Sequence, residues 1–75
     1  MTLAGKILRK VNDKLILARV DKTPEINMKV YNSKGEVIGV VYDLLGPVKN
    51  PYVLIRLSKD IDVNYVKKEK VYFKN

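Results

Sequence analysis

Six short stretches rich in Val, Ile, Leu and Tyr run through this sequence, and no segment sustains the 3.6-residue period of a helix. The stretches cover residues 3–10, 15–20, 28–32, 36–45, 52–57 and 69–74. Their lengths are typical of β-strands, which average about 5–6 residues. An open sheet of such short strands would leave long unpaired edges. The sequence therefore predicts an all-β fold, a small closed six-stranded β-barrel.

The residues between the stretches predict how the chain turns. Asn12-Asp13 tolerates the left-handed turn conformation, which favours a hairpin between the first two strands. Pro24 excludes a central strand from residues 21–27, so this segment is expected to form a loop. Ser33-Lys34-Gly35 predicts a second turn, and Gly39 predicts a bulge or bend within the longest strand.

The length and composition limit what such a chain can do. A chain of 75 residues is expected to form one domain, residues 1–75. The absence of Cys and His excludes disulfides, Cys/His zinc sites, thiol nucleophiles and His-based acid–base chemistry, and it favours an intracellular location. The apolar runs are far shorter than the ~20 residues of a membrane span, and the start lacks a signal-peptide layout, so no membrane partner is expected. The net charge of +7 first suggests nucleic acid.

Two of the predicted strands are apolar on both faces. Alternation divides them into an inner set that fills the barrel and an outer set. The inner set is Ile38, Val40, Tyr42, Leu44, Val53, Ile55 and Leu57, and the apolar members of the outer set are Val37, Val41, Leu45, Tyr52 and Leu54. In an antiparallel sheet with one wet face, the outer set should be polar. Either loops and the C-terminal segment cover this face, or it binds another protein; the short chain favours the second explanation.

The segment from Gly46 to Tyr52 contains two prolines and a glycine. Gly46 can adopt backbone angles closed to other residues, and Pro47 and Pro51 restrict the chain around them. A pre-ordered loop lowers the entropy cost of presenting Val48 and Tyr52 to a partner. The same stiffness is equally compatible with a simple connection between two strands.

One extended motif resembles a known family. The residues Gly39-x-Val41-x-Asp43-Leu44-Leu45-Gly46-Pro47-Val48-x-x-Pro51-Tyr52-Val53 are similar to the signature of the Gar/Naf family, core subunits of H/ACA ribonucleoproteins. Gly5-Lys6-Ile7-Leu8 followed by Leu15-Ile16-Leu17 resembles the opening hairpin of that family. The family usually has an aromatic residue where Leu45 stands, so this chain departs from the pattern there.

The resemblance implies a six-stranded barrel of the kind found in translation-factor second domains. It further implies a non-catalytic subunit that binds a dyskerin-like pseudouridine synthase and promotes substrate RNA loading and release during rRNA pseudouridylation and ribosome biogenesis. It implies no catalytic residue, cofactor or metal in this chain, and mostly indirect contact with H/ACA guide RNA and substrate rRNA. Together with the outer set, it implies a protein interface made of Val41, Leu45, Gly46, Pro47, Val48, Pro51, Tyr52 and Leu54. A weak homodimer of the free protein through the same patch is plausible. An archaeal-type member would be cytoplasmic, and a eukaryotic relative nucleolar.

An alternative hypothesis is a stand-alone RNA-binding barrel with a basic, tyrosine-containing C-terminal surface. Lysines interleaved with aromatic residues are typical of barrels that bind oligonucleotides. The candidate RNA-proximal residues are Lys67, Lys68, Lys70 and Lys74, with Tyr72 among them. A solvated charged face would look the same in sequence. The carboxylates offer no competing chemistry, because Asp60 and Asp62 lack a third ligand and Asp43 is expected to accept hydrogen bonds from turn amides.

Overall fold

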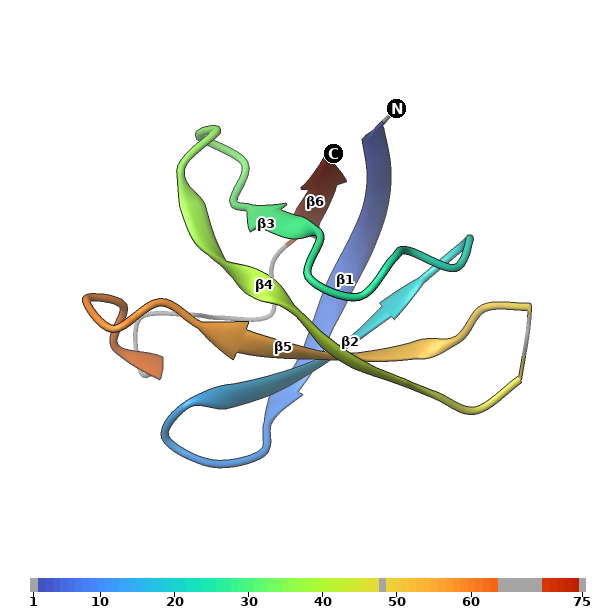
Figure 1. The fold of residues 1–75 in the computed structure, drawn as a ribbon, viewed down its shortest axis with the longest axis horizontal. Coiled ribbons are helices and arrows are strands. Elements are labelled where there is room, and N and C mark those ends of the chain that lie inside the picture. Colours follow the sequence, from blue (N-terminus) through green and yellow to red (C-terminus); the bar gives the residue numbers. More distant parts are fainter. Residues whose placement is uncertain (1, 48, 64–69, 75) are drawn as a thin grey trace.

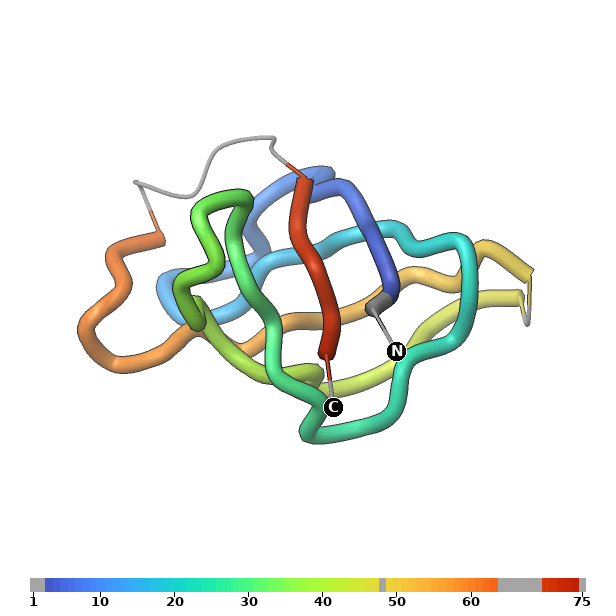
Figure 2. Tube along the Cα trace, turned by 90° about the horizontal axis from the view of Figure 1, so that it is seen from above, coloured from blue at the N-terminus to red at the C-terminus, as the bar shows by residue number. Residues whose placement is uncertain are grey.

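The chain forms a closed barrel of six antiparallel strands, as predicted (Figure 1). A computed structural model describes residues 2–47, 49–63 and 70–74. The strands are β1 (Thr2–Lys10), β2 (Leu15–Val20), β3 (Lys29–Tyr31), β4 (Val37–Leu45), β5 (Tyr52–Leu57) and β6 (Lys70–Lys74). Around the barrel they follow the order β1-β2-β5-β4-β3-β6, so β6 closes the barrel between β1 and β3 (Figure 2). In the described part of the chain, no helix is long and apolar enough to cross a membrane.

Two asparagine side chains hold the hairpin turns in place. The Oδ1 atom of Asn12 accepts hydrogen bonds from the amides of Lys14 and Leu15, both at 2.9 Å. The Oδ1 atom of Asn32 likewise accepts from the amides of Lys34 and Glu36, both at 2.9 Å. Each side chain thus satisfies backbone donors that the tight turn leaves without a strand partner, which is why Asn favours such positions.

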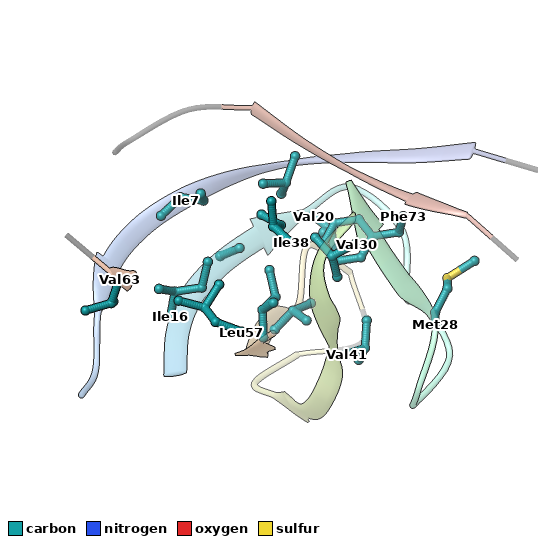
Figure 3. Packing of buried hydrophobic residues seen from close by; sticks show 14 residues of the cluster. Ile7, Ile16, Val20, Met28, Val30, Ile38, Val41, Leu57, Val63 and Phe73 are labelled. Carbon is teal, nitrogen blue, oxygen red and sulfur yellow. The ribbon is translucent and has the colours of Figure 1, made fainter. Parts of the chain in front are cut away.

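The core fills the barrel with aliphatic side chains and one phenylalanine. Its buried residues are Ile7, Ile16, Ala18, Val20, Met28, Val30, Ile38, Val41, Val53, Ile55, Leu57, Val63, Val71 and Phe73 (Figure 3). Every strand contributes to this set, so the core binds all six together. Among the described residues, no polar or charged side chain is buried. Val53, Ile55 and Leu57 of β5 point inward, as alternation predicts.

On β4 the predicted faces are partly wrong. Val41 was expected on the outer face but is fully buried, whereas Tyr42 was expected in the core and is 52% exposed. The register explains both errors: the pairing with β5 passes from Val41 directly to Asp43, so Tyr42 is an extra, bulged residue. Ile38 is skipped in the same way in the pairing with β3. Each bulge resets the alternation, which reverses the faces of the residues that follow.

Gly39 lies one residue after the first of these bulges, close to where the sequence predicts one. It is opposite Leu57 of β5 and Val30 of β3. A Cβ atom built at this position would lie 2.2 Å from the carbonyl oxygen of Arg56. The two backbones therefore approach so closely here that only glycine fits.

Candidate functional site

The outer surface of β2, β5 and β4 is largely apolar. Its members are Leu15, Leu17, Leu45, Tyr52 and Leu54, which we call the apolar face. The register places Leu17 opposite Leu54, and Tyr52 opposite Leu45. Leu45 is 42% exposed and the other four are half-buried. These side chains adjoin one another across three strands, because the rows of adjacent strands are neighbours. Two exposed charged residues share the rows, with Asp43 opposite Leu54 and Arg56 opposite Leu15.

Arg19 of β2 lies at the edge of this face. It is opposite Tyr52 in the pairing of β2 with β5, and its guanidinium carbon is 5.4 Å from the centre of the Tyr52 ring. A guanidinium over an aromatic ring is held by a cation–π interaction. Arginine and tyrosine are also the residues that most often dominate the binding energy of protein interfaces.

The described residues of the loop after β4, 46–47 and 49–51, lie beside the apolar face, and the end of the loop at Pro51 is bonded to β2. Gly46 has a φ of 84°, and a Cβ atom there would lie 3.1 Å from the Cδ2 atom of Tyr52, so the tyrosine ring packs beside the glycine. Asn50 also adopts a left-handed φ of 53°. The buried Pro51 accepts a hydrogen bond from the amide of Val20 through its carbonyl oxygen, at 3.3 Å. Gly46 thus adopts the left-handed backbone that the sequence allows it, whereas pre-ordering of the whole loop stays a prediction, because Val48 lies outside the described residues.

The predicted interface residues divide into three groups. Leu45, Tyr52 and Leu54 lie on the apolar face, and Gly46 and Pro47 are exposed beside it. Pro51 is buried, and Val41 belongs to the core, so neither is available to a partner. Val48 lies outside the described residues.

Sequence reasoning missed the contribution of β2 to the apolar face. Leu15 and Leu17 alternate with the buried Ile16 and Ala18, so the signal was present in the first hairpin. The alternation that separates inner from outer residues in 36–45 and 52–57 also operates in 15–20, where it places both leucines on the outside.

A second surface gathers lysines and tyrosines on the outside of β3, β6 and β1. Its members are Lys6, Lys29, Tyr31, Lys70, Tyr72 and Lys74, which we call the lysine–tyrosine face. Tyr31 is directly opposite Tyr72, and Lys29 is opposite Lys74. The predicted RNA-proximal residues Lys70 and Lys74 are thus exposed on one strand with Tyr72 between them, while Lys67 and Lys68 lie outside the described residues.

The carboxylates of the described residues offer no set of ligands for a metal ion. Among the described residues, no group of three or more acidic side chains is placed to hold one. Asp43 accepts a hydrogen bond from the amide of Leu44 at 2.8 Å, which lies within β4 and is not one of the turn amides that the sequence suggested as donors.

A small closed barrel with these two surfaces has the character of a binding domain. The chain matches the Gar1/Naf1 RNA binding region family over residues 1–75 and belongs to this family, which confirms the resemblance of its glycine-proline motif. The family consists of non-catalytic RNA-binding domains, and membership supports an H/ACA-related RNA-binding role.

Two archaeal proteins are similar to this chain. An uncharacterized protein of Methanothermobacter thermautotrophicus is 39% identical over 62 residues, which are 83% of this chain and 67% of the relative. An uncharacterized protein of Methanocaldococcus jannaschii is 35% identical over 74 residues, which are 93% of this chain and 90% of the relative. The similarity to both extends over most of the barrel.

Proposed function

We propose that this barrel is a non-catalytic subunit of an H/ACA ribonucleoprotein and binds a dyskerin-like pseudouridine synthase through the apolar face. In this role it promotes the loading of substrate RNA and its release after pseudouridylation. Family membership supports the H/ACA context, and the apolar face supports a protein partner.

The observation that carries the proposal is the apolar outer surface of three adjacent strands. The core is already complete inside the barrel, so these side chains are not needed to fill it. Leu17, Leu54 and Tyr52 nevertheless occupy positions that a free antiparallel sheet would give to polar residues. A partner that covers them removes apolar area from water, which contributes about 25 cal/mol per Å² of area buried.

The loop beside the apolar face lowers the cost of binding. Gly46 and Asn50 already hold left-handed conformations, and the hydrogen bond between Pro51 and Val20 anchors the end of the loop to β2. Backbone that is already held at Gly46, Asn50 and Pro51 loses less entropy when a partner docks there, so more of the contact energy appears as affinity.

The test is a titration of the barrel with the synthase from the same organism, in the absence of RNA. Leu45→Asp places a charge on the apolar face, whereas Val37→Asp makes the same kind of change at the other end of β4, opposite Tyr31. The two residues are a matched pair, 42% and 43% exposed. We expect Leu45→Asp to weaken binding at least tenfold, about 1.4 kcal/mol, and Val37→Asp to leave it unchanged.

Equal affinities for the two variants would contradict the assignment of this face. Sedimentation of the free protein adds a second readout, because a homodimer is the other occupant that an exposed apolar patch can have. If Leu45→Asp abolishes a dimer and leaves the synthase affinity intact, the face joins two copies and the proposal is wrong.

A further inference from the structure

The lysine–tyrosine face pairs like charges with one another. Lys29 is directly opposite Lys74, and Lys6 is opposite Lys70 on one side and Arg19 on the other. Within the described residues, none of these five cations is bonded to a carboxylate. Like charges directly opposite each other destabilise a sheet. This part of the barrel nevertheless has three such pairs, Lys6–Arg19, Lys6–Lys70 and Lys29–Lys74. Such violations are expected where a surface serves binding, because a ligand then supplies the missing countercharge.

The same surface carries an aromatic pair. Tyr31 and Tyr72 are opposite each other on β3 and β6, and both rings are half-buried. The Nζ atom of Lys74 lies 5.1 Å from the centre of the Tyr31 ring, which holds this ammonium group beside the pair. Tyrosines on the outside of a sheet, with lysines beside them, provide stacking surfaces for bases and contacts for phosphates at the same time.

Two hollows lie at opposite ends of β6. One, of about 310 Å³, is lined by Lys29, Tyr31 and Lys74 together with Ile26, Asn27, Met28 and Glu25. The other, of about 320 Å³, is lined by Lys6, Arg19 and Lys70 together with Ala4, Gly5, Leu8 and Asp21. Cations outnumber carboxylates in both hollows. An RNA backbone that runs along β6 would therefore contact cations in the hollow at each end of the strand. The tyrosine pair lies beside the hollow that Tyr31 lines.

We propose that the lysine–tyrosine face binds single-stranded RNA directly, with a base stacked on Tyr72 and phosphates held by Lys29, Lys74, Lys6 and Lys70. Single-stranded RNA fits because its bases can leave one another and stack on the rings, whereas a duplex keeps its bases enclosed. The family description names RNA binding for the chain as a whole, and the inference assigns it to one face and one class of RNA. It goes beyond the proposed function, which requires only indirect contact with RNA.

The centre of the site lies away from the apolar face. In the closed order β1-β2-β5-β4-β3-β6, β6 is separated from β5 by two strands in either direction, so the central strands of the two faces are on opposite sides of the barrel. The faces adjoin where β1 pairs with β2, because Lys6 is opposite Arg19, so Arg19 is left unchanged in the variants that tell the faces apart. Loss of synthase binding and loss of RNA binding are therefore separate outcomes, and each can fail while the other holds.

The first experiment measures the affinity of the isolated barrel for an unstructured, fluorescently labelled 12-nucleotide RNA by anisotropy. Tyr72→Ala removes the stacking ring, and we expect a roughly 5- to 100-fold loss of affinity. Tyr72→Phe keeps the ring and should restore binding. Tyr42→Ala is the matched control, because Tyr42 is exposed on β4, away from this face, and its loss should have no effect. A loss of affinity in Tyr42→Ala as large as that in Tyr72→Ala would overturn the site.

The second experiment separates binding from folding. Lys6→Glu and Lys29→Glu each convert like-charge pairs into opposite-charge pairs, so these variants should melt at the same or a higher temperature while binding RNA at least tenfold more weakly. Lys59→Glu makes the same change in net charge in the segment after β5 and should reduce binding less than twofold. If Lys59→Glu weakens binding as much as Lys29→Glu, only net charge matters and the site is wrong.

Two competitors test the ligand itself. A duplex RNA of the same length that binds as tightly would overturn the stacking interaction, because its bases are not available to Tyr72. Single-stranded DNA of the same sequence that binds as tightly would overturn the assignment to RNA, since the 2′-hydroxyl would then contribute nothing. Weaker binding of both competitors is the expected result.

Discussion

At the scale of one residue, Gly39 is required because the barrel leaves no room for a side chain at this position. Its Cα faces the backbone of β5, where the carbonyl oxygen of Arg56 would lie 2.2 Å from any added Cβ. A backbone atom cannot move aside as the end of a flexible side chain can. The sequence motif contains this glycine, and the structure assigns it to strand packing and not to contact with a partner.

Gly39→Ala should therefore destabilise the barrel without touching either binding face. We expect the free energy of unfolding to fall by about 1–3 kcal/mol, as for other substitutions that overfill a packed interior. Urea denaturation monitored by tyrosine fluorescence measures it. Gly35→Asn is the matched control, because Gly35 has a φ of 83° with open space around it, and asparagine tolerates that conformation. A loss in Gly39→Ala no larger than that in Gly35→Asn would contradict the close approach.

At the scale of the strand, the sequence predicts where elements lie better than which way their side chains point. The turns at Asn12 and Asn32 are local, because each depends on a side chain bonding to amides two to four residues away. The ends of the strands can therefore be predicted from neighbouring residues. The inward and outward faces of β4 cannot, because the bulges at Ile38 and Tyr42 arise only from its pairing with β3 and β5.

The bulge at Tyr42 predicts opposite effects for two adjacent residues. Val41→Ala removes fully buried methyl groups and should cost about 1.5–3 kcal/mol of unfolding free energy. Tyr42→Ala truncates a side chain that is 52% exposed and should change stability by less than about 0.5 kcal/mol. Thermal unfolding of the two variants side by side measures both. Strict alternation along β4 predicts the reverse order, so a larger loss in Tyr42→Ala would contradict the register.

In the candidate site, too, the sequence predicts the residues that are close together in the chain and not those that distant strands bring together. Leu45, Tyr52 and Leu54 were found because they lie in or next to one motif and alternate over a short distance. The partnership of Tyr31 with Tyr72 could not be found in this way, because it depends on β6 closing the barrel against β3, some 40 residues away in the chain. Long-range pairing of this kind leaves no local signature, and Lys29 and Lys6 were missed for the same reason.

At the scale of the whole molecule, barrel closure separates two kinds of chemistry. The apolar face is centred on β5 and the lysine–tyrosine face on β6, which are opposite each other around the ring of strands. A synthase on the apolar face would leave the lysine–tyrosine face open. The lysine–tyrosine face holds four of the 15 Lys and Arg residues, Lys6, Lys29, Lys70 and Lys74, so a local cluster of charge and not the net charge of +7 defines it.

The dependence of affinity on salt concentration should distinguish binding at the two faces. Association through apolar side chains releases few counterions, whereas RNA binding by lysines lowers log K in proportion to log[salt], with a slope of about −0.7 for each phosphate contact with a single strand. Replacing Lys29 and Lys74 together by Gln should therefore make the RNA slope shallower by about 1.4 and leave synthase affinity unchanged. Leu45→Asp should do the opposite, weakening synthase binding and keeping the RNA slope. Titrations of both variants between about 50 and 200 mM salt measure the slopes. If either variant alters both affinities together, the two ligands share one surface, and the division of the barrel into opposite faces is wrong.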